Sequence, residues 1–171
     1  MSERNFDADV IERYLREVAE ELPPANPPRT VIIVGGALLA LRGFRDATRD
    51  VDSVEPLNPE LENVIERVAA RHSLTPKWLN HSAAPFRPAT FDIDDCDVLL
   101  DEPGLRVLCA PLDQVFLMKL YASRAADTDD LQAIWPNCSF ESPEAAVDAF
   151  YNAYPHEERD PFLADHLRNL I

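Results

Sequence analysis

Apolar residues recur at three- and four-residue steps in two segments of the chain, residues 7–21 and residues 61–71. Such steps bring side chains onto one face of a helix, so each segment predicts an amphipathic helix. Pro23 and Pro24 end the first helix, and Asn58-Pro59-Glu60 supplies a start for the second. The apolar positions are Val10, Ile11, Tyr14, Leu15 and Val18 in the first segment and Leu61, Val64, Ile65 and Val68 in the second.

Between these helices, Thr30 opens the apolar run Val31-Ile32-Ile33-Val34, which is typical of a buried strand. Residues 96–100 and 105–110 flank the turn sequence Asp101-Glu102-Pro103-Gly104, and this arrangement predicts a hairpin. Residues 74–87 are too irregular for a long element. Their aromatic residues Trp78 and Phe86 are either buried or form a surface on which a base could stack.

Helical patterns also cover a segment from Pro111 to about Ala126, residues 143–153 and residues 161–171. Together these elements predict an α/β fold, with a small mixed sheet flanked by helices and a helical C-terminal part. A chain of 171 residues suits a single domain over residues 1–171 with a sizeable core. We expect the sheet-containing core to cover about residues 28–131 and the C-terminal helical part to cover about residues 111–171.

No stretch approaches the length of a membrane span, and the N-terminal residues lack a charged start followed by an apolar region, so we expect no membrane partner and a cytoplasmic location. The cysteines, Cys96, Cys109 and Cys138, are odd in number and widely spaced. This pattern fits small buried side chains better than disulfides or a zinc cluster. The four histidines show no ligand spacing either, so a metal site would have to consist of carboxylates.

The candidate chemistry lies where the apolar run meets Gly35 and Gly36 and where Asp50-Val51-Asp52 follows thirteen residues later. A helix from about Ala37 to Arg42 separates the two motifs. Because side chains alternate along a strand, Asp50 and Asp52 point to the same side. Two neighbouring carboxylates repel unless a cation lies between them, and hard oxygen ligands favour Mg²⁺, which takes further ligands from phosphates. Glycines at a strand-to-helix turn let the backbone approach a phosphate closely, so the guest we expect is a nucleoside triphosphate.

Each motif alone has a plain alternative. Turns use glycine freely, and a chain with 31 acidic residues contains Asp-x-Asp by chance. Their joint spacing, the apolar flanks and the intervening helix favour a site.

The net charge of −15 argues against broad attraction to nucleic acid, although it leaves room for a local basic groove. Arg42, Arg45 and Arg49 lie between the glycines and the acidic motif, where they either meet phosphates or line a solvated loop. The chain has only two lysines, Lys77 and Lys119, against fourteen arginines, and both lysines fall in motif-like segments.

The run from Gly35-Gly36 to Asp50-Val51-Asp52 resembles the signature of the DNA polymerase β-like nucleotidyltransferases, and particularly of their small bacterial AbiEii- and MenT-related toxin branch. Thr48, the triplet Trp78-Leu79-Asn80 and the segment from Ala110 to Leu131 add to the resemblance, which covers roughly residues 30–131. This segment contains Lys119 and Asp127, at positions similar to the lysine and aspartate motifs of those enzymes.

The resemblance implies a Mg²⁺-dependent transfer of a nucleotide from a triphosphate to an acceptor hydroxyl. Its catalytic residues would be Asp50, Asp52, Lys119 and Asp127, and its nucleotide-binding residues would be Gly35, Gly36, Arg49, Lys119 and Arg124. The metal ligands would be Asp50, Asp52 and a third carboxylate, for which we expect Asp97, with Asp92 or Asp94 as alternatives. An ordinary lysine at position 119 and an ion pair between Arg124 and Asp127 remain the plain alternatives.

By the same resemblance, the acceptor is the 3′ end of tRNA, the outcome is growth inhibition and the partner is a cognate antitoxin. An antibiotic or a protein hydroxyl is an alternative acceptor. The main alternative function is a catalytically inactive nucleotidyltransferase-like module that binds a nucleotide or a protein. A plain structural α/β domain is the third interpretation.

Overall fold

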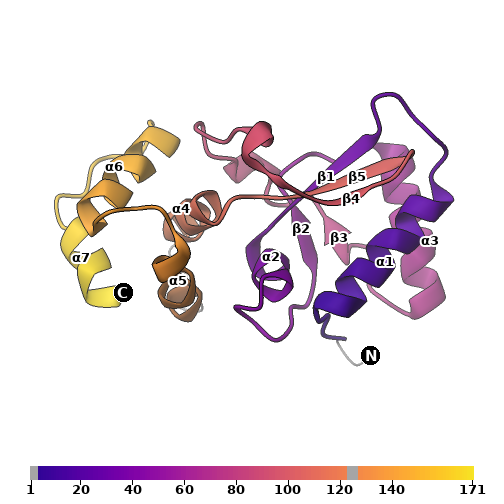
Figure 1. Ribbon diagram of the computed structural model, residues 1–171, viewed down its shortest axis with the longest axis horizontal. Coiled ribbons are helices and arrows are strands. Elements are labelled where there is room, and N and C mark those ends of the chain that lie inside the picture. The colour runs from indigo at the N-terminus through magenta and orange to yellow at the C-terminus, as the bar shows by residue number, and fades with distance from the viewer. Residues whose placement is uncertain (1–3, 123–126) are drawn as a thin grey trace. The chain divides into compact units, whose positions relative to one another are not determined.

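The computed structural model describes residues 4–122 and 127–171 (Figure 1). The chain forms two compact units, one holding residues up to Pro85 together with Cys96–Ala110, and the other holding Phe86–Asp95 together with Pro111–Ile171. Each unit is described by itself below. The single domain expected over residues 1–171 stays a prediction.

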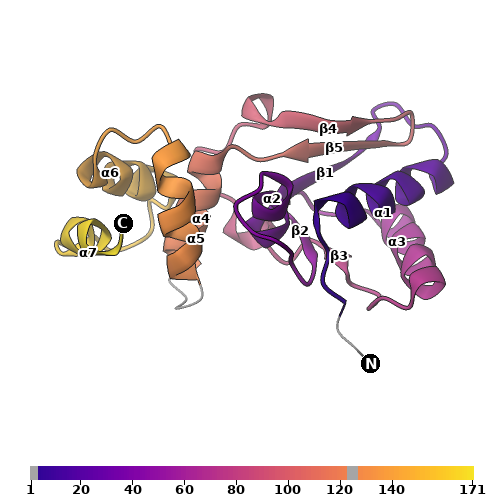
Figure 2. The ribbon, with the colours of Figure 1, turned by 60° about the horizontal axis from the view of Figure 1, so that its bottom comes forward.

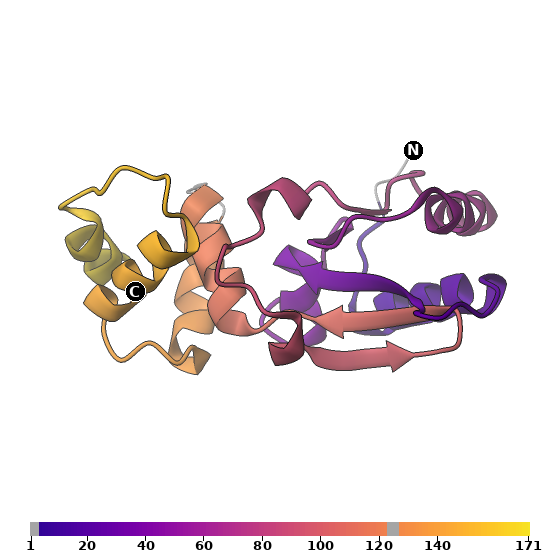
Figure 3. The same ribbon diagram turned by 90° about the horizontal axis from the view of Figure 1, so that it is seen from above.

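A five-stranded sheet lies in the first unit, with the strand order β3-β2-β1-β5-β4 (Figure 2), and the antiparallel pair β4 and β5 is seen from another side in Figure 3. The central strand β1 pairs in parallel with β5 and antiparallel with β2, so the sheet is mixed. At the two edges, β3 runs parallel to β2 and β4 antiparallel to β5. This mixed sheet with flanking helices confirms the predicted α/β fold class. The strands are β1 Arg29–Val34, β2 Val51–Ser53, β3 Leu79–Asn80, β4 Asp97–Asp101 and β5 Leu105–Cys109.

The predicted apolar run forms β1, and its residues from Val31 to Val34 are buried. Because successive side chains of a strand point to opposite faces, this burial means that β1 is covered on both. The predicted hairpin is also present, as β4 and β5, with an irregularity in the pairing between Val98 and Leu100. The short strand β3 lies in the segment for which the sequence predicted no long element.

Among its described residues, the first unit contains the helices α1 Ala8–Glu21, α2 Gly35–Leu41 and α3 Pro59–His72. The Asp7 carboxylate accepts a hydrogen bond of 2.9 Å from the Val10 amide at the start of α1. The Asn58 side chain accepts one of 2.8 Å from the Leu61 amide and so caps α3. The predicted apolar faces of α1 and α3 are largely buried, as the amphipathic pattern requires.

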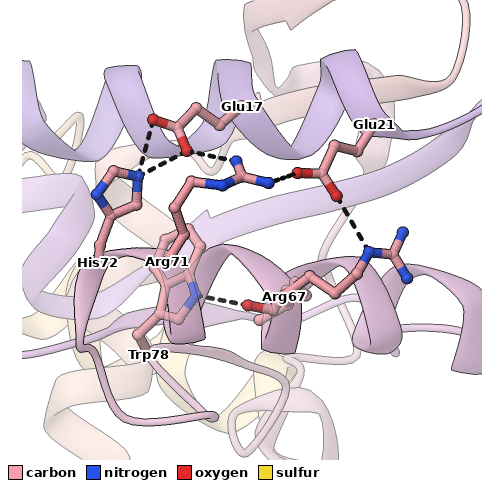
Figure 4. Close-up of polar contacts among 7 residues, drawn as sticks. Glu17, Glu21, Arg67, Arg71, His72 and Trp78 are labelled. Carbon is pink, nitrogen blue, oxygen red and sulfur yellow. Dashed lines mark hydrogen bonds and ion pairs between the residues drawn. The ribbon is translucent and has the colours of Figure 1, made fainter.

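Helices α1 and α3 lie side by side and are joined by a network of charged side chains (Figure 4). Glu17 contacts Nε2 of His72 at 2.7 Å and the Arg71 guanidinium at 3.1 Å. Glu21 accepts from Arg71 and, at 3.1 Å, from Arg67. Trp78 is fully buried beside α3, and its indole N–H donates to the Ile65 carbonyl at 3.1 Å. Of the two interpretations of Trp78, the buried one is therefore correct.

The second unit is helical, with α4 beside α5 and α6 beside α7 (Figure 2). The helix predicted for residues 143–153 is present with those bounds, and Ser142 caps it by accepting from the Ala145 amide. The predicted end of α4 near Ala126 lies outside the described residues. The sequence did not predict α5. The bounds are α4 Leu112–Ala122, α5 Thr128–Ile134, α6 Pro143–Ala153 and α7 Leu163–Leu170.

In the described part of the chain, none of the helices combines the length and the apolar character that crossing a membrane requires.

Candidate active site

The glycine turn and Asp52 lie next to each other. Asp52 on β2 is paired with Val34, the last residue of β1, and α2 begins immediately afterwards at Gly35. Gly35 has a φ of +65°, a left-handed backbone conformation that residues other than glycine rarely adopt. A Cβ at Gly35 would lie 3.5 Å from the Asp52 Oδ2. The strand pairing therefore brings the carboxylate against the turn.

Burial alternates along β2 as the sequence predicted. Val51 and Ser53 are fully buried, Asp52 is half-buried and Asp50 is exposed. This alternation is that of a strand whose Asp50 and Asp52 lie on the side opposite Val51 and Ser53. The pattern is compatible with both carboxylates facing one bound cation.

Ser53 is a structural residue of the site that the sequence did not single out. Its buried hydroxyl accepts from the Ile32 amide at 3.1 Å and donates to the Glu55 carbonyl at 2.8 Å. These bonds fix the end of β2 against β1, directly beside Asp52. The sequence signal was only a small polar residue between Asp52 and Val54.

Thr48 and Gly36 hold the loop before the acidic motif. The backbone of Thr48 exchanges two hydrogen bonds with Phe6, of 2.7 and 2.9 Å, and the Thr48 side chain is buried. A Cβ at Gly36 would lie 2.8 Å from the Thr48 hydroxyl and would also meet the Arg45 guanidinium. Position 36 therefore requires glycine because Thr48 and Arg45 approach its backbone closely, whereas position 35 requires glycine because of its backbone conformation.

Asp50 lines a cleft of about 400 Å³ next to β2. Arg49, also predicted to bind the nucleotide, lines the same cleft. On the neighbouring strand, Asn80 is paired with Asp52, and its side chain accepts from the Ser82 amide at 2.9 Å. The acidic motif is thus open to a cavity on its β3 side.

Asp50 and Asp52 fit a Mg²⁺ ion by the chemistry of their donors. Both supply hard carboxylate oxygens, Asp52 from β2 and Asp50 from just before it, and Mg²⁺ is commonly held by one or two protein carboxylates with waters and phosphate oxygens as its remaining ligands. Within residues 4–122 and 127–171, no group of three or more His, Cys, Asp or Glu side chains is arranged to hold a metal ion. The described residues therefore offer two carboxylates, Asp50 and Asp52, as protein ligands for the ion.

The structure does not bring Asp97 to this pair. Asp97 lies on the edge strand β4, separated from β2 by β1 and β5. The pairings of Asp97 with Cys109, of Cys109 with Ile33 and of Ile33 with Ser53 place Asp97 on the sheet face opposite Asp52. Its carboxylate forms an ion pair with Arg42 at the end of α2. A third ligand at Asp97 is therefore at odds with the strand order. Asp92 and Asp94, the alternatives, are exposed and belong to the second unit.

Lys119 and Asp127, predicted to be catalytic, meet in the second unit. The Lys119 ammonium lies 2.9 Å from Oδ1 of Asp127 and 2.9 Å from Oδ2 of Asp130. All three side chains are at most 8% exposed. The structure thus shows Lys119 as the centre of a buried ionic cluster rather than as an ordinary exposed lysine. Arg124 lies outside the described residues.

The cysteines were expected to be small buried side chains. Cys109 is buried, and Cys96 and Cys138 are half-buried. Burial raises the pKa of Cys109 to about 11 and, together with Asp113, raises the pKa of Cys138 to about 12. Both groups are therefore protonated and weakly nucleophilic near neutral pH.

The mixed sheet, the glycine turn at the end of its central strand and the aspartate beside that turn define the class of a nucleotidyltransferase-like α/β protein. Residues 13–162 match the family described as nucleotidyltransferase of unknown function (DUF6036), and the chain belongs to this family. Comparisons with the curated proteins and with the solved structures gave no match. The predicted relation to nucleotidyltransferases is thus confirmed at the level of the family, and the toxin branch stays a prediction.

Proposed function

We propose that the protein transfers a nucleotide from a Mg²⁺-bound nucleoside triphosphate to an acceptor hydroxyl. The observation that carries this proposal is the position of the Asp52 carboxylate against Gly35, at the turn where β1 leads into α2. A carboxylate beside an open backbone turn suits a ligand that presents phosphates and a cation together.

In this proposal Asp50 and Asp52 hold the ion, which when bound neutralises charge on the triphosphate oxygens. The turn at Gly35 and Gly36 gives the phosphates access to the backbone, and the first amides of α2 have no partner within that helix. The acceptor oxygen forms a bond to the α-phosphorus, the bond from that phosphorus to the bridging oxygen of the β-phosphate breaks, and pyrophosphate leaves.

Asp127 is the proposed residue that orients the acceptor hydroxyl or takes its proton. Lys119 would hold Asp127 in a fixed orientation, because its ammonium contacts both Asp127 and Asp130. This role differs from the direct phosphate contact implied by the family resemblance. Arg49 and Arg124 remain proposed nucleotide ligands.

For the acceptor we propose RNA, and specifically the 3′ end of tRNA, with growth inhibition as the outcome, a cognate antitoxin as the partner and the cytoplasm as the location. The support is the resemblance of the glycine, acidic and lysine motifs to the AbiEii- and MenT-related toxins.

The test is to incubate the purified chain with Mg²⁺, each labelled nucleoside triphosphate in turn and total RNA. We expect label in RNA with the wild type and none with Asp52→Ala. The matched control is Asp97→Ala, which removes an exposed aspartate of the same sheet and should retain transfer. Equal transfer by the wild type and Asp52→Ala would contradict the proposal.

A second candidate is an inactive nucleotidyltransferase-like module that binds a nucleotide or a protein. It is favoured by the engagement of Lys119 in a buried ionic cluster and by the position of Asp97 away from Asp52. Triphosphate binding that depends on Asp52, without transfer to RNA or to any other acceptor hydroxyl supplied, would support this function instead.

A further inference from the structure

The cleft beside Asp50 is basic, in a chain whose net charge is −15. Its charged lining consists of three cations, Arg4, Arg49 and Lys77, and a single anion, Asp50. The remaining lining residues are hydroxyl, amide and apolar side chains, among them Thr75, Asn80 and Ser82. The local charge therefore favours an anionic ligand, against the mean charge of the molecule.

Two of these cations are well placed to contact a ligand. Lys77 is exposed, and no carboxylate among the described residues pairs with its ammonium. Arg4 is also exposed, and its guanidinium donates to the His72 carbonyl at 3.0 Å, which anchors it at the C-terminal end of α3 while other N–H groups remain available. By contrast, Arg29, Arg42 and Arg71 have carboxylate partners.

The strand order separates this cleft from the glycine turn. β2 lies between β1, which ends at the turn, and β3, whose Asn80 lines the cleft. The acidic motif on β2 is thus reached from two sides, the turn on the β1 side and the cleft on the β3 side. If the triphosphate occupies the turn, as proposed above, the cleft is open to the second substrate.

The cleft continues beyond Asn80. A second cleft of about 430 Å³ shares Lys77, Asn80 and Ser82 with the first, and its other lining residues include the apolar Pro56, Leu57 and Pro85 and the carboxylates Glu62 and Glu66. A basic compartment beside one that offers apolar surface suits a strand whose phosphates lie in the first compartment and whose flat base lies in the second. Two adjoining compartments also offer more length than a single phosphate group would need.

We propose that this cleft binds the phosphodiester backbone of a single-stranded nucleic acid whose terminal hydroxyl lies toward Asp50. Lys77 and Arg4 contact phosphates, and the adjoining compartment receives a base. This assignment rests on the proposed nucleotidyl transfer, since it gives the acceptor of that reaction a binding site.

The experiment is a fluorescence anisotropy titration of the full chain with a labelled single-stranded RNA decamer that has a free 3′ hydroxyl, at several salt concentrations. The variants are Lys77→Ala and Lys77→Ala combined with Arg4→Ala. The control is Arg16→Ala, which removes the same charge from an exposed position of α1 outside the cleft. Thermal melts establish that each variant is folded, and binding of Mg²⁺-triphosphate is measured in parallel.

We expect each cleft substitution to weaken RNA binding about three- to tenfold and to lower the slope of log affinity against log salt by about 0.7, with triphosphate binding unchanged. Arg16→Ala should bind RNA like the wild type. The proposal is overturned if the wild type does not bind the decamer, if the double variant binds it equally well, or if a nucleoside monophosphate binds as tightly as the decamer.

Failure of the transferase proposal has a different signature. If RNA binding depends on Lys77 but the wild type binds no triphosphate, the cleft is still a nucleic-acid site and the proposed nucleotidyl transfer is wrong. Loss of triphosphate binding in Lys77→Ala, with RNA binding intact, would make the cleft part of the nucleotide site and overturn the acceptor assignment.

Discussion

Gly35 and Gly36 are adjacent, yet different physical reasons require glycine at the two positions. Gly35 needs a left-handed backbone to turn from β1 into α2, and its missing Cβ leaves room beside Asp52. Gly36 has an ordinary φ and needs space, because Thr48 and Arg45 lie against it. The sequence predicted the turn, but the neighbours of Gly36 come from nine and twelve residues away and could not be inferred from local pattern.

Replacing Gly36 by alanine is therefore expected to destabilise the first unit by about 1–3 kcal/mol, since Thr48 is held by Phe6 and cannot easily move. Chemical denaturation measures the loss. The control is the same substitution in a Thr48→Ala background, where the contact is absent and the penalty should shrink. Equal penalties in both backgrounds would show that the Thr48 contact is not the cause.

The two lysines offer a matched pair for a second prediction. Lys119→Met removes a buried cation that contacts both Asp127 and Asp130, so we expect a loss of about 3–5 kcal/mol in unfolding free energy. Lys77→Met, at an exposed position, should change stability by no more than about 0.5 kcal/mol. Adding Asp127→Asn and Asp130→Asn to Lys119→Met should restore part of the loss. A Lys119→Met variant as stable as Lys77→Met would contradict the ionic cluster.

At the scale of elements, the sequence predicted the helices and strands that have a local hydrophobic pattern of their own. The steps of apolar residues in α1 and α3 and the apolar run of β1 are local signals, and the structure confirms all three. The two-residue strand β3 has no such signal, because it exists through its pairing with β2. Helix α5 has only seven residues, and its Asp127 makes no side-chain capping bond that a sequence pattern could suggest.

The contact between α1 and α3 gives a prediction about pH. A hydrogen bond from Arg71, supported by Arg67, holds the pKa of Glu21 below its ordinary value of 4.5. Because the pKa is lower in the folded state, the interaction contributes fully above pH 4.5 and is lost as the pH falls through the lower folded value.

Glu21→Gln should therefore reduce stability at neutral pH, and its difference from the wild type should shrink in acid. Denaturant titrations at a series of pH values measure this difference. Glu20→Gln, an exposed change on the same helix, provides the comparison. A deficit in Glu21→Gln that stays constant down to pH 3 would rule out the ion pair as its source.

At the scale of the whole molecule, strand order decides which residues can act together. Asp50 and Asp52 are close in sequence, so alternation along an extended strand is enough to predict that they point to one side. Asp97, expected as the third ligand, lies on β4 with β1 and β5 between its strand and β2, and this placement depends on tertiary pairing. Lys119 contacts partners eight and eleven residues along the chain, beyond two helical turns. Its burial therefore could not be predicted from the local sequence pattern either.

Charge also acts at this scale. A net charge of −15 repels nucleic acid in general, so binding at one basic cleft would be local and strongly dependent on salt. The sequence suggested such a groove through the arginines at positions 42, 45 and 49. Of these, Arg49 lines the cleft beside Asp50, and the folded chain adds Arg4 and Lys77, which are far apart in sequence.

The central claim is that Asp52, beside the glycine turn, helps to hold a Mg²⁺-bound triphosphate. Isothermal titration of the chain with a nucleoside triphosphate in excess Mg²⁺ tests it directly, with Asp52→Asn and Asp97→Asn as isosteric variants. The account predicts that Asp52→Asn weakens binding at least about tenfold, equivalent to about 1.4 kcal/mol, while Asp97→Asn binds like the wild type. Wild-type affinity in Asp52→Asn, or an equal loss in Asp97→Asn, would contradict it.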